Sequence, residues 1–282
     1  MRILITGNSG FVGGSLSARL RREHELFYLA RPHSPMHTPG AHDSTFFFAD
    51  NNIGALTQFI CSNKIDGVIH LASLYLQRHE QKDIPDLIQS NVYFGTAVLE
   101  AAASAGVKWF INTGTIWQNY NAPNGSDVYC PVNLYAATKQ AFMDIAKFYS
   151  ETSNMRICTL KLCDTYGPND PRKKILSRFD DIAKSGETLQ MSAGEQKIDI
   201  LHIDDVVDGF AHLAEMLQNG DDLRDEYVLS SGQQLTLREL AAKYEQEHNV
   251  HLNIEWGALP YRVREVMTPY KGNVLPGWKP KK

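Results

Sequence analysis

Thr6-Gly7-Asn8-Ser9-Gly10-Phe11-Val12-Gly13 follows the short apolar segment Arg2-Ile3-Leu4-Ile5 and leads into an amphipathic helical pattern over residues 11–22. The first glycine permits a tight strand-to-helix turn, the second lets the backbone approach a diphosphate, and the third lets the helix pack closely on the strand. Glycines alone would indicate an ordinary turn. Between a strand and a helix, this spacing predicts a dinucleotide-binding site.

Strand and helix patterns alternate along the first 162 residues. We predict strands near 2–6, 26–30, 45–49, 67–71, 108–113 and 156–162, and helices near 11–22, 53–62, 85–105 and 133–152. This alternation is typical of βαβ units, whose parallel strands are buried on both faces and therefore form continuous apolar runs. Phe46-Phe47-Phe48 and Val68-Ile69 are such runs. The pattern predicts an α/β fold with a Rossmann-type, doubly wound parallel sheet.

Tyr135 and Lys139 are four residues apart in the predicted helix 133–152, so they share one face. A tyrosine hydroxyl passes a proton to a carbonyl oxygen when its pKa is lowered, and an ammonium one turn away lowers it. Alone, the pair is also a common helix surface. Thr113 strengthens the functional interpretation, because it follows the apolar strand and would bring a second hydroxyl to the same sheet edge. We predict that Thr113, Tyr135 and Lys139 form a proton-donating catalytic set.

Further motifs in the same order resemble the extended short-chain dehydrogenase/reductase family, the NAD-dependent epimerase/dehydratase group that acts on nucleotide sugars. They are Ile69-His70-Leu71-Ala72, Asn91-Val92-Tyr93-Phe94-Gly95-Thr96, Leu160-Lys161-Leu162-Cys163-Asp164-Thr165-Tyr166-Gly167-Pro168 and Asp199-Ile200-Leu201-His202-Ile203-Asp204-Asp205-Val206. The resemblance implies a dinucleotide-binding domain over 1–168, to which 199–221 return. Residues 169–198 and 222–282 would form a smaller C-terminal α/β lobe that binds the substrate.

The resemblance also implies which residues contact the cofactor. They are Gly7, Ser9, Gly10, Phe11, Val12, Gly13, Arg31, Asp50, Asn51, Leu71, Ala72, Ser73, Asn91, Tyr135 and Lys139. Arg31 ends the second strand, where an NAD-preferring site generally has an acidic residue. A guanidinium would instead pair with a 2′-phosphate. We therefore expect NADP(H), with NAD(H) as the alternative if Arg31 is an ordinary surface arginine.

The reaction follows from the residues beside Thr113. Dehydratases of the family commonly carry Asp-Glu directly after the catalytic threonine, whereas this chain has Gly114-Thr115. A 4,6-elimination is therefore not expected. The resemblance is strongest to nucleotide-sugar 4-ketoreductases of the CDP-abequose and CDP-paratose synthase type, which implies NADPH-dependent reduction of a 4-keto-6-deoxy or 3,6-dideoxy sugar. The alternatives are a 4-epimerase with tightly bound NAD and a non-catalytic NADP-binding regulator.

Substrate contacts are expected beyond the catalytic strand and in the lobe. The candidates are Thr115, Trp117, Asp164, Arg178, Lys197 and Arg262. Many relatives place an arginine before the returning Asp199 to bind diphosphate, but Ile198 stands here, so Lys197, Arg178, Arg262 or Arg264 would take that role. As an alternative, Trp117 would only pack in the wall of the site. Arg262 and Arg264 would, as an alternative, lie on a solvent-exposed strand face.

Composition excludes several classes. The chain has 282 residues, a formal net charge of −4 and dispersed basic residues, which do not indicate a nucleic-acid partner. No apolar run approaches the roughly 20 residues of a membrane span, and because Met1 leads directly into a strand we expect no cleaved signal. Four cysteines without Cys-x-x-Cys spacing indicate free thiols in the cytoplasm.

The remaining expectations concern metals and partners. His33, His37 and His42 are irregularly spaced without a carboxylate or cysteine partner, so we predict no metal site. The resemblance implies a homodimer formed by the tyrosine helix and the helix before it.

Overall fold

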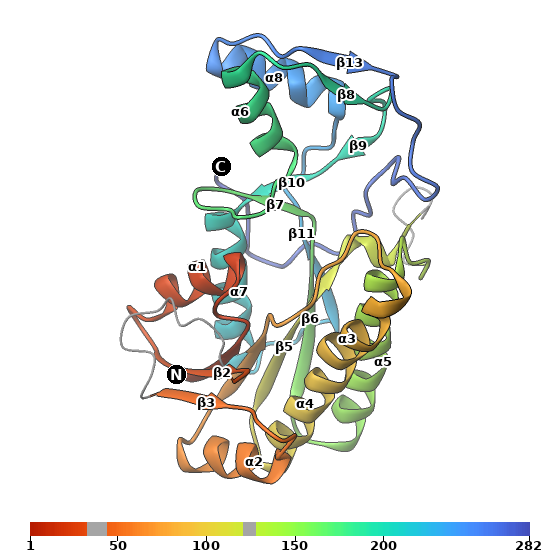
Figure 1. Cartoon of the computed structure of the whole chain (residues 1–282). Helices are drawn as coiled ribbons and strands as arrows, with labels where there is room; N and C mark the ends of the chain where they lie inside the picture. Colours follow the sequence, from red (N-terminus) through yellow and green to blue (C-terminus); the bar gives the residue numbers. More distant parts are fainter. Residues whose placement is uncertain (33–43, 121–127) are drawn as a thin grey trace.

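A central parallel sheet organises the molecule. The computed structural model describes residues 1–32, 44–120 and 128–282. Within them, the sheet has seven strands in the order β11-β6-β5-β4-β1-β2-β3, and all neighbours are parallel (Figure 1). The strands are β1 (Arg2–Thr6), β2 (Glu25–Ala30), β3 (Thr45–Phe47), β4 (Gly67–His70), β5 (Trp109–Thr115), β6 (Arg156–Leu162) and β11 (Glu226–Leu229). The predicted α/β fold of Rossmann type is confirmed.

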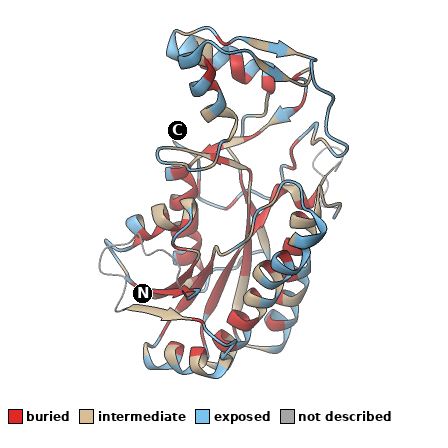
Figure 2. Cartoon of the chain, in the orientation of Figure 1, coloured by how far each residue is buried: buried red, intermediate tan, exposed pale blue. Residues whose placement is uncertain are grey.

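Helices cover both faces of this sheet. One face carries α1 (Phe11–Leu20) and α7 (Ile203–Asn219), and the other carries α2 (Ile53–Ser62), α4 (Phe94–Ser104) and α5 (Leu134–Thr152). Successive residues of β1 point to opposite faces, so Ile3 and Ile5 pack under α1 and α7 while Leu4 packs in the other core. Figure 2 shows the strands buried between the helices. The sheet order reverses between β1 and β4, which opens the crevice where such folds bind ligands.

The predicted helix 85–105 is divided in the structure. It comprises α3 (Ile84–Ile88), a π-helical turn (Gln89–Tyr93) and α4. Pro85 lies in the first turn of α3, where a missing N–H is tolerated. The extra residue of the π-helical turn shifts the helical register around the buried Asn91, which places that side chain between two other segments of the site.

A small lobe lies beyond the carboxyl ends of the strands. It contains α6 (Ile175–Ser185), α8 (Leu237–His248) and two short strand pairs. The pairs are β8 (Leu189–Met191) with β13 (Ile254–Trp256), and β9 (Lys197–Ile198) with β12 (Leu235–Thr236). Phe179, Leu240 and Tyr244 belong to a separate buried cluster of this lobe. A parallel pair, β7 (Asp164–Tyr166) with β10 (Ile200–His202), connects the lobe to the central sheet.

The end of the chain corrects the predicted boundary. Residues 222–282 were assigned to the lobe, but β11 pairs with β6 in the central sheet. Tyr270, Leu275 and Trp278 are buried in the core beneath α1 and α7. The sequence missed this return because β11 is a four-residue strand and the final segment has no regular structure to predict.

One strand is less buried than its sequence indicates. Phe46 and Phe47 are only partly buried, whereas Phe48 is buried. The cause is position, because β3 is the outermost strand and has a neighbour on one side only. Val68 and Ile69, in the middle of the sheet, are fully buried as expected.

Candidate active site

The glycine turn is shaped by close approach. Gly7 has a φ of 74°, and a Cβ there would lie 2.7 Å from the backbone nitrogen of Ala72. A Cβ on Gly13 would lie 2.1 Å from the carbonyl oxygen of Gly7. Gly10 occupies the N-cap position of α1 and has no side chain to accept hydrogen bonds from the first amides of the helix. Those amides therefore remain available to an anion. The buried Asn8 Nδ2 has no hydrogen-bond partner among the described residues. These features fit a dinucleotide diphosphate.

Side chains at the ends of β1 and β4 fix the floor of this crevice. The Thr6 hydroxyl lies 2.9 Å from His70 Nδ1 and accepts hydrogen bonds from the amides of Leu71 and Ala72 at 3.2 and 3.0 Å. Burial, assisted by the charge of Lys139, lowers the pKa of His70 to about 3. The imidazole is therefore neutral, and Leu71 and Ala72 lie directly beside the glycine turn.

Asn91 holds this segment to α5. Its Oδ1 accepts from the Leu74 amide at 2.7 Å and from the Ser73 hydroxyl at 3.1 Å, while its Nδ2 donates to Leu74 O and to Thr138 Oγ1, both at 3.0 Å. Two donors and two lone pairs exhaust an amide. Asn91 therefore positions the chain and has no donor or acceptor left for a hydrogen bond to a cofactor, while its contact with the cofactor stays a prediction.

Asn133 begins α5 and so places the predicted catalytic pair. Its side chain accepts from the Ala136 amide at 2.9 Å, a conventional N-cap, and its Nδ2 donates to Gln77 O. Tyr135 thus lies in the first turn and Lys139 one turn later. Burial raises the pKa of Tyr135 to about 12, against the Ser73 hydrogen bond and the charge of Arg172. In the protein alone, burial therefore outweighs the expected lowering of this pKa.

Lys139 is only 2% exposed, and burial lowers its pKa from 10.5 to about 8. Between those values the unfolded chain binds more protons than the folded one, so this group makes stability rise with pH there. We expect Lys139→Met to increase the free energy of unfolding at pH 7 by on the order of 3 kcal/mol. Urea unfolding of both proteins at several pH values measures this. The gain in stability should shrink as pH rises towards 10.5. A gain that grew with pH would contradict the burial argument.

Two threonines of β5, Thr113 and Thr115, differ in their hydrogen bonds. Thr113 donates its hydroxyl proton to His70 O at 2.9 Å, so its oxygen is left as an acceptor. Thr115 is buried, and its hydroxyl accepts from the Trp117 amide at 3.3 Å to cap the short turn Ile116–Gln118. Thr115 does not line the cleft described next. Its hydroxyl caps this turn, and its predicted substrate contact stays a prediction.

A cleft of about 970 Å³ separates the strand ends from the lobe. Trp117, Asp164, Arg178, Lys197 and Arg262, all predicted as substrate contacts, line it. Basic side chains outnumber acidic ones along the wall. The basic residues are Arg78, Arg172, Lys173, Lys174, Arg178, Lys197, Arg262 and Arg264, and the acidic ones are Asp164, Asp199 and Glu265. Such a lining favours an anionic ligand.

Aromatic rings form one wall of the cleft beside the predicted proton donor. The Tyr75 ring is edge-on to that of Tyr135, with centroids 5.1 Å apart, and lies 5.8 Å from the Trp117 ring. Lys174 lies over Tyr75 and pairs with the Asp164 carboxylate. The sequence analysis missed Tyr75, Arg172 and Lys174 as site residues. The run of basic residues Arg172-Lys173-Lys174 was the available signal for Arg172 and Lys174, and Tyr75 had none.

The remaining predicted cofactor residues follow β2 and β3. Arg31 is exposed directly after β2, at the same sheet edge as the glycine turn. Asp50 and Asn51 form the turn before α2, with left-handed φ values of 53° and 52°. Their position is compatible with the adenosine half of a dinucleotide.

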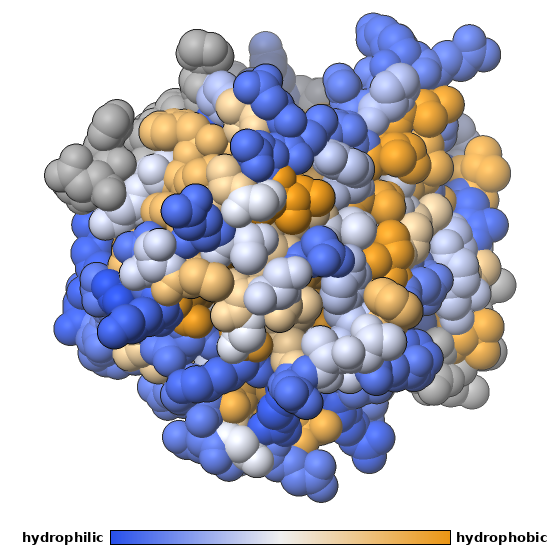
Figure 3. Space-filling model, turned by 90° about the horizontal axis from the view of Figure 1, so that it is seen from below, coloured by the Kyte–Doolittle hydropathy of each residue, from blue (hydrophilic) through white to orange (hydrophobic). Residues whose placement is uncertain are grey.

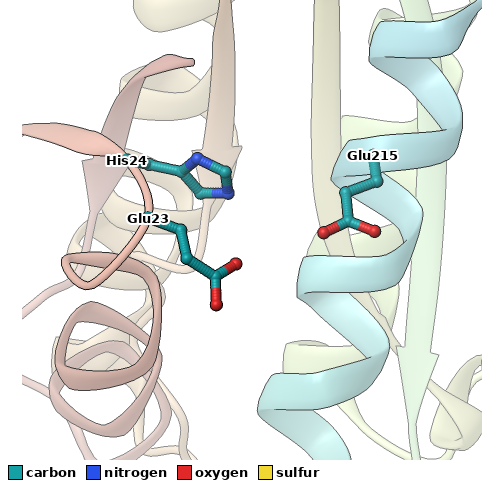
Figure 4. Close-up of side chains that lie close together, drawn as sticks. All are labelled: Glu23, His24 and Glu215. Carbon is teal, nitrogen blue, oxygen red and sulfur yellow. The ribbon is translucent and has the colours of Figure 1, made fainter.

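The histidines for which no metal site was predicted, His33, His37 and His42, lie outside the described ranges. In the described part of the chain, ligand atoms of Glu23, His24 and Glu215 lie within 4.8 Å of one another (Figure 4). Both glutamates are exposed, and Glu23 pairs with Arg19 at 3.0 Å. Glu23 and His24 directly precede β2, at the sheet edge away from the cleft, and Glu215 lies in α7. We assign no metal to it.

Comparison with known proteins places this site in context. A profile of the NAD dependent epimerase/dehydratase family matches residues 3–229. The CDP-abequose synthase of Yersinia pseudotuberculosis is 28% identical over 273 residues, covering 95% of this chain and 92% of the relative. The UDP-glucose 4-epimerase of Mycolicibacterium smegmatis is 26% identical, covering 85% and 80%.

Solved structures share the fold. UDP-N-acetylglucosamine 4-epimerase from Methanobrevibacter ruminantium M1, in complex with UDP-N-acetylmuramic acid, superposes with a TM-score of 0.82 at 18% identity. The match covers 99% of this chain and 93% of that one.

None of the helices in the described part of this chain combines the length and apolar character that crossing a membrane requires.

Proposed function

Because the chain belongs to the NAD dependent epimerase/dehydratase family, we propose that it reduces a nucleoside-diphosphate-linked 4-keto-6-deoxy or 3,6-dideoxy sugar with NADPH. The observation that carries this proposal is the position of Tyr135, a phenol at the head of α5 beside a cation-lined cleft. The similarity to CDP-abequose synthases over nearly the whole chain supports the substrate class.

The proposed chemistry needs a hydride donor and a proton donor. Bound NADPH would supply the hydride to the C4 carbonyl carbon. Tyr135 gives its phenolic proton to the carbonyl oxygen, which becomes the hydroxyl of the product. Lys139, buried one turn along α5, stabilises the phenolate that remains. Thr113 accepts a hydrogen bond from the substrate or from Tyr135, because its own proton is engaged by His70 O.

The surroundings of Gly114 disfavour elimination. A Cβ on this residue would lie 2.8 Å from Lys161 Cγ. Lys161 is itself only 3% exposed and pairs with Glu226 at 2.8 Å. The buried lysine therefore occupies the space that a side chain at position 114 would need. This supports the sequence-based argument that the carboxylate pair of the dehydratases is absent.

Labelled cofactor tests the proposal. The protein is incubated with NADPH carrying deuterium at the transferred position and with a panel of nucleoside-diphospho-4-keto-6-deoxyhexoses. Deuterium at C4 of the product is expected. A nucleotide hexose that is epimerised without added NADPH, and without gain of label, would establish the alternative 4-epimerase with tightly bound NAD. Binding of NADPH without conversion of any member would favour a non-catalytic regulator.

Arg31 provides a prediction about the choice of cofactor. Arg31→Asp is expected to lower the affinity for NADPH relative to NADH by about 10- to 100-fold, because it removes charge-assisted hydrogen bonds to the 2′-phosphate. Fluorescence titration with both cofactors measures the ratio. Arg22→Asp makes the same charge change on an exposed residue beyond α1 and is the matched control. An unchanged ratio would place the discrimination elsewhere.

We also propose that the protein is a homodimer. Ile84, Ile88, Tyr93 and Phe148 are large exposed apolar residues on α3, the π-helical turn and α5. Figure 3 shows more apolar surface on the right, the side on which α3 and α5 lie in Figure 1. Burying such side chains against a second copy is favourable.

Phe148, at 59% exposed, is the residue to test. Phe148→Asp is expected to convert the dimer to a 31.7 kDa monomer, measured by light scattering after size exclusion. Val274→Asp changes a residue of similar exposure, 55%, on the C-terminal segment and should leave the dimer intact. A dimeric Phe148→Asp variant would argue against this surface.

We propose that the protein is cytoplasmic. Cys61, Cys130, Cys158 and Cys163 are all free, which fits a reducing compartment.

A further inference from the structure

Arg172 joins two parts of the site that the chain brings together from far apart. It lines the cleft, and its guanidinium carbon lies 4.7 Å from the centre of the Phe11 ring. Phe11 is the first residue of α1, directly after the glycine turn. One cation therefore lies against both the cleft and the uncapped start of α1.

The guanidinium is held so that one edge stays open. Nε and Nη2 donate to the two carboxylate oxygens of Asp170, both at 2.7 Å, and Nη2 also donates to Thr165 Oγ1 at 2.8 Å. Nη1 has no hydrogen-bond partner in the described part of the chain. The Arg172 side chain is 34% exposed, whereas that of Asp170 is 11% exposed. Two N–H donors of a permanently charged group are thus available in a fixed plane.

We propose that Arg172 is a diphosphate-binding residue, whose Nη1 donates to phosphate oxygens of a nucleotide at the start of α1. The inference rests on the proposed function, since both the cofactor and the substrate would carry a diphosphate. The free amides of α1 and the open guanidinium edge offer donors to the same kind of anion from two sides. Stacking on Phe11 restrains the guanidinium plane before the ligand arrives.

A purely structural role is the competing explanation. The contact with Asp170 spans two residues and would shape the loop after β7 whether or not an anion binds. Such a role would not require an Nη1 group that is left without a hydrogen-bond partner in the described part of the chain. The two explanations differ in what they predict for ligands with and without a diphosphate.

Direct binding separates them without any turnover. We compare wild type, Arg172→Gln, Arg172→Lys and the control Lys184→Gln, which removes the same charge from an exposed residue at the end of α6. NADPH is titrated by fluorescence, and CDP, UDP and adenosine 2′-monophosphate by calorimetry. Arg172→Gln is expected to weaken binding of a diphosphate nucleotide by about 10- to 100-fold. Arg172→Lys should recover part of the loss, because it restores charge without the planar fork.

The ligands identify the source of the diphosphate. Weaker binding of NADPH alone assigns the contact to the cofactor, weaker binding of CDP or UDP alone assigns it to the substrate, and loss of both assigns it to both. Adenosine 2′-monophosphate should bind all variants equally. Unchanged diphosphate binding by Arg172→Gln, or an equal loss for the monophosphate, overturns the inference. These experiments measure binding and no product. Their result can therefore be interpreted even if the proposed reduction does not occur.

Discussion

Replacing Tyr135 by phenylalanine is expected to lower turnover of the 4-keto sugar by about 10²- to 10⁴-fold while leaving NADPH affinity unchanged. The phenol is the proton donor in the proposed reaction, and its ring remains in the variant to pack against Tyr75. The loss should therefore fall on kcat. Steady-state kinetics with the deuterated cofactor, together with NADPH titration, measures both quantities.

Tyr75→Phe is the matched control for this experiment. It removes the hydroxyl group of the neighbouring ring. The centroids of the Tyr75 and Tyr135 rings are 5.1 Å apart. Burial and nearby charges raise the pKa of Tyr75 to about 12, and we assign it no proton transfer. Tyr75→Phe should therefore lower turnover much less than Tyr135→Phe does. If Tyr135→Phe retained most of its turnover, or if Tyr75→Phe lost as much, the assignment of the proton donor would be wrong.

The second large effect is expected at the glycine turn. Gly13→Ala places a Cβ 2.1 Å from Gly7 O, closer than folded chains tolerate, so α1 or the turn must move. The displaced amides would no longer meet the diphosphate. We expect a loss of at least about tenfold in NADPH affinity and a loss of about 1–3 kcal/mol in the free energy of unfolding. Cofactor titration and urea unfolding measure the two effects.

Gly14→Ala controls for the insertion of a methyl group in the same helix. A Cβ on Gly14 meets its nearest neighbour, Asn8 O, at 3.6 Å, an ordinary contact. Alanine also favours a helix over glycine by up to about 1 kcal/mol. Gly14→Ala should therefore keep NADPH affinity and gain stability. Equal losses in both variants would show that the close approach at Gly13 has no special role.

The sequence predicted the parts of the fold that local chemistry encodes. The glycine turn works because a Cβ does not fit at Gly7 or Gly13, and that constraint is visible in the residue type itself. The helix that carries Tyr135 and Lys139 begins at Asn133, whose capping preference is also local. For the same reason the succession of strands and helices up to β6 is close to the predicted one.

The sequence is least informative where distant segments meet. Asn91 was assigned to the cofactor because the motif alone does not show that Leu74 and Thr138 would use its whole amide. Arg172 was passed over, since only the tertiary structure brings it to Phe11, more than 150 residues earlier in the chain. Each depends on contacts that no local pattern carries.

The C-terminal segment has a consequence for biosynthesis. Trp278 donates its indole N–H to Asp205 O, and the amides of Lys281 and Lys282 donate to the Asp205 carboxylate. These contacts complete a core begun by Ile3 and Ile5. The half of the molecule built on the central sheet therefore cannot finish packing until residue 278 has left the ribosome, although its first strand is made at the start of synthesis.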